Sequence, residues 1–270
     1  MVSVVPEERI SKCADVLAEL RYSGEQLECL PPVLIPRNEA EAYRVQFALH
    51  DRLSDMGGGP RVGWKIGCTT KVMQEFLNIP SPCAGGMFAA GVVQSPASYD
   101  FASLRRPGVE CEIAVRLRAD VPQSGAPYDR QTIAPFVASV MSAMEVVEER
   151  FVNFRDPKVD AATLIADDFF HLGAVLGPEM SLSEGLNLAA LGGRTWIGGQ
   201  ERGAGLGADV MGHPFAALAW LANHLATYDL NLKAGDIVLT GSIVASQYPE
   251  TPAKAITEIA QLGRVISDFM

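Results

Sequence analysis

Two glutamates stand two residues apart in the stretch 107–115, Pro-Gly-Val-Glu-Cys-Glu-Ile-Ala-Val. This spacing could bring both carboxylates to one functional site. Apolar and β-branched residues alternate with the carboxylates after a Pro-Gly pair, which predicts a β-strand. Side chains two apart on a strand share a face, so Glu110 and Glu112 point the same way. Apolar residues continue the strand, so we expect that face to be partly enclosed. Two enclosed carboxylates need a cation between them, and oxygen ligands suit Mg²⁺ or Mn²⁺. The pattern predicts a metal site with an open coordination face, and therefore an enzyme.

A lysine lies in a short predicted strand over 61–67, between an aromatic residue and an isoleucine. Taken alone, Lys65 is most simply a surface lysine. The functional alternative is that apolar neighbours lower its pKa, or that a nearby anion holds it charged, so that it handles protons or polarises a carbonyl. Thr69 and Thr70 follow, before a predicted helix over 71–77. Their hydroxyls and the free backbone N–H groups either receive a carboxylate or only cap the helix.

The composition is that of an ordinary globular protein. The chain has 270 residues, of which 48% are hydrophobic and 20% are charged, and this is enough to bury a sizeable core. The net charge of −10 argues against a nucleic-acid-binding surface. The five cysteines show no zinc-binding spacing, and no apolar run approaches the roughly 20 residues of a membrane span. We expect a cytoplasmic protein with reduced cysteines, no signal peptide and no membrane partner.

Several elements must position these residues. We expect helices between Pro6 and Leu53 and again over 214–225, where apolar residues recur at helical spacing. The stretch 80–96 is rich in Gly, Ala and Pro, which favours a lid or site-lining loop. The apolar stretch 135–144 is expected to begin as a helix.

Three isolated histidines receive the simplest interpretation. His171 stands in an otherwise apolar run, and a histidine without other ligand types nearby is more often a hydrogen-bonded core residue than a metal ligand. We expect the same of His50 and His224.

The motifs together resemble one known family. From the segment Gly-Trp-Lys-Ile-Gly-Cys-Thr-Thr at 63–70, the chain is similar to the 2-keto-4-pentenoate hydratase / 2-oxo-3-hexenedioate decarboxylase family, within the fumarylacetoacetate hydrolase superfamily. The likeness covers nearly the whole chain, in the family's order. It continues through 107–115, 143–146, 212–214, 219–223, 232–236 and 240–242.

The resemblance implies an α+β fold, in which a mixed, mostly antiparallel rolled β-sheet is surrounded by helices. It implies a helical N-terminal section over 1–60 and a β-roll catalytic domain over 61–270. It also implies Mg²⁺ or Mn²⁺ held by Glu110, Glu112 and Glu145, with Lys65 as the catalytic lysine beside the substrate's keto or enol oxygen. Spacing alone would not distinguish Glu145 from the two glutamates at 148 and 149. Matching substrate-pocket positions are Thr69, Asp167, Gly241 and Ser242.

The chain departs from the family pattern at positions that face the rest of the substrate. Cys83 stands where relatives carry an aspartate, and a thiol is a weak proton carrier beside a carboxylate. Phe170 fills the serine position of an Asp-Asn-Ala-Ser-like segment, and Gly108 stands where relatives often have a basic residue. We expect Cys83 and Phe170 to shape the substrate pocket. The residues that would stabilise an enolate match the family pattern. The residues that would decide which reaction the enolate undergoes differ from it.

The leading prediction is a metal-dependent lyase of aromatic-compound catabolism, which hydrates a 2-hydroxyalka-2,4-dienoate to a 4-hydroxy-2-oxo acid. Decarboxylation of a 2-oxo-enedioate is the alternative, because it needs the same enolate stabilisation but no carboxylate base for water. Hydrolysis of an acylpyruvate lacks a convincing water-activating histidine–glutamate pair. An inactive homologue that only binds an oxo acid is a further alternative. By analogy with relatives we expect a homo-oligomer.

Overall fold

The computed structural model describes residues 6–182 and 185–270 of the chain. The helices within these ranges are α1 (Pro6–Ser23), α2 (Glu39–Leu53), α3 (Lys71–Leu77), α4 (Arg130–Ile133), α5 (Ala161–Ala166) and α6 (Pro214–Ala226). The strands are β1 (Arg61–Gly67), β2 (Cys83–Phe88), β3 (Val92–Gln94), β4 (Ala97–Tyr99), β5 (Pro107–Leu117), β6 (Val137–Glu148), β7 (His171–Leu176), β8 (Met180–Ser181), β9 (Gly192–Ile197), β10 (Gln200–Leu206), β11 (Ile237–Gln247), β12 (Ala253–Ile259) and β13 (Gly263–Phe269).

A large mixed sheet carries the candidate site. Its strands follow the order β2-β1-β11-β5-β6-β7-β3, with β8 paired to β6. The central pairs β11–β5, β5–β6 and β6–β7 are antiparallel, whereas β1 runs parallel to β11. The two long strands β5 and β6 stay in register over most of their length, which fixes the relative positions of the side chains that they carry.

A second sheet, in the order β10-β9-β12-β13-β4, packs against the first. An apolar cluster fills the space between them, with Val109 and Met144 from the large sheet and Ala255 and Val265 from the small one. Val109 and Met144 lie on the opposite faces of β5 and β6 from the glutamates, because neighbouring residues on a strand point to opposite sides. The sheet-to-sheet core therefore supports the strands that carry the carboxylates.

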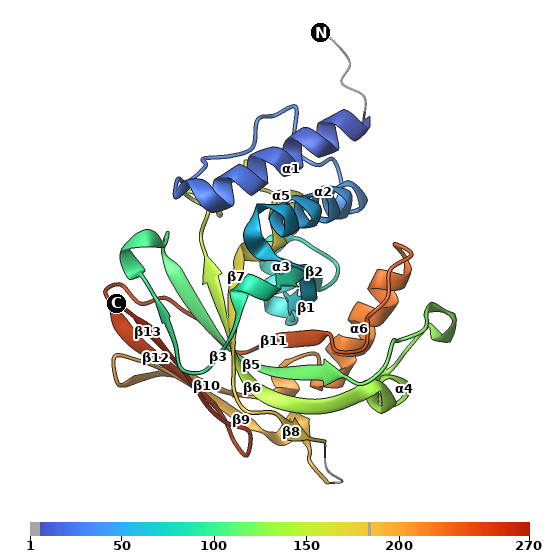
Figure 1. The fold of residues 1–270 in the computed structure, drawn as a ribbon, viewed down its shortest axis with the longest axis vertical. Coiled ribbons are helices and arrows are strands. Elements are labelled where there is room, and N and C mark those ends of the chain that lie inside the picture. Colours follow the sequence, from blue (N-terminus) through green and yellow to red (C-terminus); the bar gives the residue numbers. More distant parts are fainter. Residues whose placement is uncertain (1–5, 183–184) are drawn as a thin grey trace.

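The helices α1, α2 and α5 lie together at one end of the molecule (Figure 1). The Asn38 side chain caps α2 by accepting a hydrogen bond from the backbone N–H of Glu41, as its sequence position predicts. Buried Leu17 and Leu49 join these helices to the main core. None of the helices in the described ranges has the length and apolarity that crossing a membrane requires.

The observed elements correct two predictions and leave one open. Residues 137–148 form strand β6 instead of a helix, and 83–88 form the fully buried strand β2 instead of a lid loop. Strand β6 is buried along nearly its whole length, so its sequence has no alternating polar face that would identify a strand. The helices α1 and α2 precede β1, but the division of the chain at residue 60 stays a prediction.

Candidate metal centre and active site

Strands β5 and β6 bring three carboxylates together. Glu110 lies directly opposite Glu145 in the antiparallel register, and Glu112 is two residues further along the same face of β5. Each of the three offers a carboxylate oxygen, and these oxygens lie within 4.8 Å of one another. Glu112 and Glu145 are buried, whereas Glu110 keeps some exposure. Register thus unites residues that are more than thirty positions apart in the sequence.

The three carboxylates experience different environments. Burial, followed by repulsion from Glu145, raises the pKa of Glu110 to about 7. The same two causes, with Glu110 as a further negative neighbour, raise the pKa of Glu112 well above its ordinary value. Burial would also raise the pKa of Glu145, but the charge of Lys65 and a hydrogen bond from His171 outweigh it, and the pKa is lowered. Glu145 is therefore the most firmly ionised member.

Lys65 is the cation of this site. It projects from β1 and is 3% exposed, with its Nζ 3.4 Å from Glu145 Oε1 and 3.0 Å from the carbonyl oxygen of Phe169. Burial alone would lower the pKa of Lys65, but the negative charges of Glu145 and Glu110 outweigh it and raise the pKa. Of the two functional alternatives for this lysine, the structure supports the one in which nearby anions keep it charged.

The donor set fits a hard divalent cation. Fully ionised, the three carboxylates and the Lys65 ammonium would leave two uncompensated negative charges in a buried place. Glu112 Oε1 is buried and has no hydrogen-bond partner among the described residues. An orphaned buried carboxylate oxygen beside two other carboxylates is the arrangement in which Mg²⁺ or Mn²⁺ finds oxygen ligands. The residues that would hold the ion are Glu110, Glu112 and Glu145.

The turn around Gly241 supports the carboxylates from β11. The Gly241 backbone N–H donates to Glu112 Oε2 at 2.8 Å. Gly241 has φ of +120°, and a Cβ at this position would meet the Thr69 hydroxyl oxygen at 2.6 Å, so only glycine fits. Ser242 donates its hydroxyl to the carbonyl of Val244. Thr69 and Gly241 thus lie at the site, while the Ser242 hydroxyl is engaged with its own strand.

A hydroxyl that the sequence analysis did not single out contacts the cluster directly. Ser246, further along β11, hydrogen-bonds Glu110 Oε1. A strand-pairing argument could have found it, because β11 neighbours β5 in the sheet.

Cys83 begins β2, opposite Gly67 at the end of β1. A hydrogen bond with Cys68 and burial together raise the pKa of the Cys83 thiol well above its ordinary value. At neutral pH this side chain is therefore a neutral thiol, not an anionic base. Small residues follow Cys83 in β2 because other side chains pack closely against this strand. A Cβ on Gly86, for example, would meet the His50 ring at 2.6 Å.

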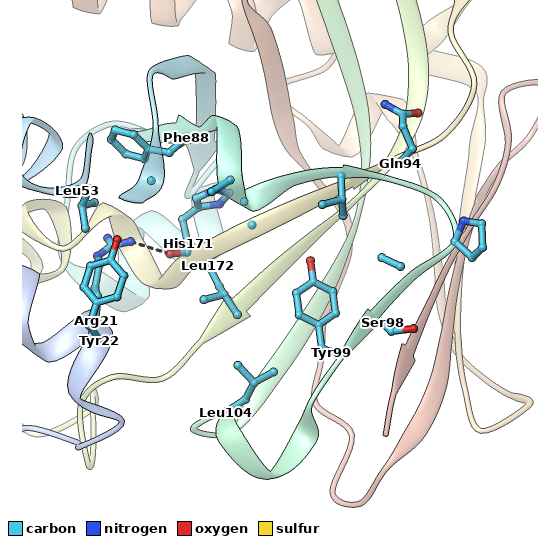
Figure 2. A pocket seen from close by; sticks show the side chains of 17 residues that line it. Arg21, Tyr22, Leu53, Phe88, Gln94, Ser98, Tyr99, Leu104, His171 and Leu172 are labelled. Carbon is cyan, nitrogen blue, oxygen red and sulfur yellow. Dashed lines mark hydrogen bonds between the residues drawn. The ribbon is translucent and has the colours of Figure 1, made fainter. Parts of the chain in front are cut away.

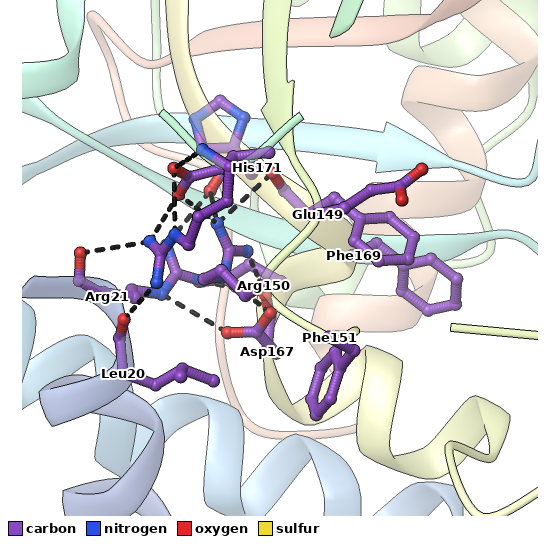
Figure 3. A network of polar contacts seen from close by, with 12 residues as sticks. Leu20, Arg21, Glu149, Arg150, Phe151, Asp167, Phe169 and His171 are labelled. Atoms are coloured by element: carbon purple, nitrogen blue, oxygen red, sulfur yellow. Dashed lines mark hydrogen bonds and ion pairs between the residues drawn. The ribbon is translucent and has the colours of Figure 1, made fainter. Parts of the chain in front are cut away.

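Asp167 belongs to a buried ion-pair network beside the site (Figure 3). The fully buried Arg150 donates from Nε to Asp167 Oδ2 at 2.8 Å, and Arg21 of α1 lies 3.5 Å from the other oxygen. Both arginines also donate to the carbonyl of His171. The Asp167 carboxylate is thus engaged by guanidinium groups, and its contribution to a substrate pocket stays a prediction. Arg150 was not anticipated from the sequence.

The segment after Asp167 has an unusual backbone. Asp168, Phe169 and Phe170 have φ values of +54°, +46° and +67°, which non-glycine residues rarely adopt. The buried Asp168 carboxylate holds this segment through His50 Nε2 at 2.7 Å and Arg21 Nη2 at 3.0 Å. Burial would raise the pKa of Asp168, but His50 and Arg21 hold it below its ordinary value. The segment presents the Phe169 carbonyl to Lys65, while Phe170 packs edge-on against Phe154 with ring centroids 5.2 Å apart.

His171 is a buried, hydrogen-bonded histidine, as the sequence analysis expected, but its partner is one of the three clustered glutamates. Its Nδ1 lies 2.8 Å from Glu145 Oε1, and the ring is buried. Burial lowers the pKa of His171. His50 is a partner of Asp168, whereas His224 stacks on Trp220 away from the carboxylates, with ring centroids 4.9 Å apart. The neighbours of His171 in the chain are apolar, and only the pairing of β6 with β7 places it beside Glu145.

A cavity of about 630 Å³ adjoins this part of the molecule (Figure 2). Its lining includes Arg21, Phe88, Tyr99, His171 and Leu172. The three clustered glutamates are not part of the lining, but His171, which contacts Glu145, is.

The fold and site define a class: an α+β protein with a buried carboxylate cluster and an ammonium group, suited to hold a divalent cation. Residues 88–268 match the family model described as fumarylacetoacetate (FAA) hydrolase C-terminal. The chain belongs to this family. The prediction of family membership and of an α+β fold is confirmed.

Named relatives refine the placement. The chain is 32% identical over 217 residues to 2-hydroxyhexa-2,4-dienoate hydratase of Comamonas testosteroni, covering 80% of this chain and 78% of the relative. It is 30% identical over 232 residues to 4-oxalocrotonate decarboxylase of Pseudomonas putida, covering 86% and 85%. The solved structure of 4-oxalocrotonate decarboxylase from Pseudomonas putida G7, complexed with magnesium and adipate, superposes with a TM-score of 0.90 at 25% identity, covering 98% of each chain. Hydratases and decarboxylases are both lyases, as the sequence predicted.

Proposed function

We propose that the protein is a divalent-metal-dependent lyase that hydrates a 2-hydroxyalka-2,4-dienoate to a 4-hydroxy-2-oxo acid. The observation that carries this proposal is the convergence of Glu110, Glu112 and Glu145, with Lys65 on the same cluster. The hydratase relative and the magnesium in the decarboxylase structure support it. The partner is then a small 2-oxo or 2-hydroxy-dienoic acid, and the homo-oligomer expected from the sequence remains part of the proposal.

A bound divalent ion would supply Lewis-acid stabilisation of negative charge on the carboxylate and keto oxygens of such an acid. Lys65 complements it from the protein. An ammonium has three N–H donors, of which one meets the Phe169 carbonyl and one faces Glu145. The third is free to donate a hydrogen bond to the substrate's 2-oxygen and so to stabilise the negative charge that this oxygen carries in the enolate. When the enol becomes the ketone, this oxygen loses its proton and a carbon of the substrate gains one. The buried surroundings of Lys65 strengthen this interaction by excluding water.

Decarboxylation of a 2-oxo-enedioate is the second candidate, and Cys83 is the observation that favours it. The thiol stands where the family pattern has an aspartate, and its raised pKa keeps it neutral. A neutral thiol does not replace a carboxylate as the base that activates water for addition at C4. Loss of CO₂ needs no such base. The similarity to the decarboxylase is also consistent with this reaction.

The test follows the ultraviolet absorbance of dienol and 2-oxo-enedioate substrates with added Mg²⁺, together with release of CO₂. Loss of dienol absorbance without CO₂ is expected for the hydratase, and loss with stoichiometric CO₂ identifies the decarboxylase. No turnover, together with thermal stabilisation by oxalate, would identify a binding protein. Glu112→Gln should abolish turnover, whereas the matched control Glu179→Gln, on a partly exposed side chain that pairs with Arg116, should leave it unchanged.

A further inference from the structure

Glu145 differs from the other two clustered carboxylates in how its oxygens are engaged. Two donors converge on one of them: His171 Nδ1 lies 2.8 Å from Oε1, and Lys65 Nζ lies 3.4 Å from the same atom. A carboxylate oxygen only accepts hydrogen bonds, so Nδ1 carries the proton in this contact. Because Oε1 is occupied from two sides, Oε2 is the atom left to face a cation.

The backbone of His171 is held independently of its ring. Its carbonyl accepts hydrogen bonds from Arg21 Nη1 at 3.1 Å and from Arg150 Nη1 at 3.3 Å (Figure 3). An irregularity in the pairing of β6 with β7 places His171 opposite Val147, and from this position its ring reaches Glu145. The His171 ring therefore reaches Glu145 from a strand end whose backbone is held by two arginines. Its position is set by the protein and does not change freely when a cation or a substrate binds.

We propose that His171 is a positioning residue, which with Lys65 restrains Glu145 so that it binds the divalent cation through Oε2 alone. The inference rests on the proposed metal site. A carboxylate with both oxygens free can rotate or chelate a metal through both of them. A carboxylate pinned at one oxygen offers a single ligand atom in a fixed direction, which leaves more of the coordination sphere for substrate oxygens. His171 acts on the metal through Glu145 and does not itself bind it.

The experiment measures Mn²⁺ affinity by electron paramagnetic resonance titration of the full chain, without substrate and at one pH. His171→Leu removes the donor at similar volume, and we expect Mn²⁺ to bind roughly 10–100-fold more weakly. His171→Asn retains an N–H near the position of Nδ1, and we expect binding within about threefold of wild type, by the same hydrogen-bond reasoning. His224→Leu, which removes a histidine stacked on Trp220, is the matched control and should bind like wild type.

A second variant keeps the inference testable if His171→Leu does not fold. His171 lines the 630 Å³ cavity, so His171→Ala opens a space that small molecules can reach from this side (Figure 2). Added imidazole should restore Mn²⁺ affinity to His171→Ala and leave the wild type unchanged.

Two results overturn the inference. One is a folded His171→Leu or His171→Ala that binds Mn²⁺ as tightly as wild type. The other is a His171→Asn that loses affinity as completely as His171→Leu, because a direct ligand or a packing role would then explain the loss. If the wild type does not bind Mn²⁺ any better than Glu112→Gln does, the proposed metal site itself fails, which is a distinguishable outcome.

Discussion

Removal of the Arg150 guanidinium is the sharpest test of what holds the segment 167–171 in place beside the carboxylate cluster. Arg150 is fully buried, and its Nε donates to Asp167 Oδ2 at 2.8 Å. Arg150→Met keeps a long unbranched side chain but leaves the Asp167 carboxylate with Arg21, 3.5 Å away, as its cationic neighbour in the network. The carbonyl of His171 also loses one of its two guanidinium donors.

The expected loss follows from the burial of the pair. Removing one partner of a buried ion pair costs about 3–5 kcal/mol, because the remaining charge is left without compensation. Arg21 retains part of the compensation, so we expect a loss near 3 kcal/mol, at the lower end of that range. Unfolding entropy of about 2.1 cal/mol/K per residue gives roughly 0.6 kcal/mol per degree for this chain. The midpoint of thermal unfolding should therefore fall by about 5 °C.

Scanning calorimetry and urea unfolding measure this loss. Arg194→Met, which breaks an exposed pair with Glu201, is the matched control and should change stability by less than about 0.5 kcal/mol. The double variant Arg150→Met/Asp167→Leu should recover at least half of the loss, because it removes the stranded charge as well. If Arg150→Met melts within a degree of Arg194→Met, the network does not stabilise the segment in the way described.

Three further predictions concern the site and its surroundings. Cys83→Asp restores the carboxylate of the family pattern, and we expect hydratase turnover to rise at least about tenfold. Product analysis by chromatography measures this rate. An unchanged rate would contradict the argument that the neutral thiol limits water addition. Gly241→Ala places a methyl group against Thr69 at a φ of +120°, so we expect a loss of about 1–3 kcal/mol in urea unfolding and weaker Mn²⁺ binding through Glu112. Burial lowers the pKa of His224 to about 4, whereas the unfolded value is near 6.5. The unfolded state then binds more protons between these values, so stability should fall by about 2 kcal/mol as pH drops from 6.5 to 4, after allowance for partial exposure. His224→Phe should flatten that slope, and an equal slope in both proteins would contradict the assignment.

Much of the framework follows from local sequence. The strand carrying Glu110 and Glu112 is marked by alternation, and the helices near the N-terminus and over 214–226 by apolar spacing and capping residues. These signals are local, so they survive in the absence of any tertiary information. The two elements that were predicted wrongly, β6 and β2, are those in which burial on both faces or a run of small residues removes the local signal.

What the sequence alone determined was the set of residues able to do the chemistry, namely a pair of glutamates on one strand face, a lysine on another strand and, through family likeness, a third glutamate. Only the tertiary structure decided how they work together. Register places Glu145 opposite Glu110, and the β6–β7 pairing brings His171 to Glu145. Hydrogen bonds and ion pairs between distant segments depend on strand order and register, and no local pattern in the chain encodes those.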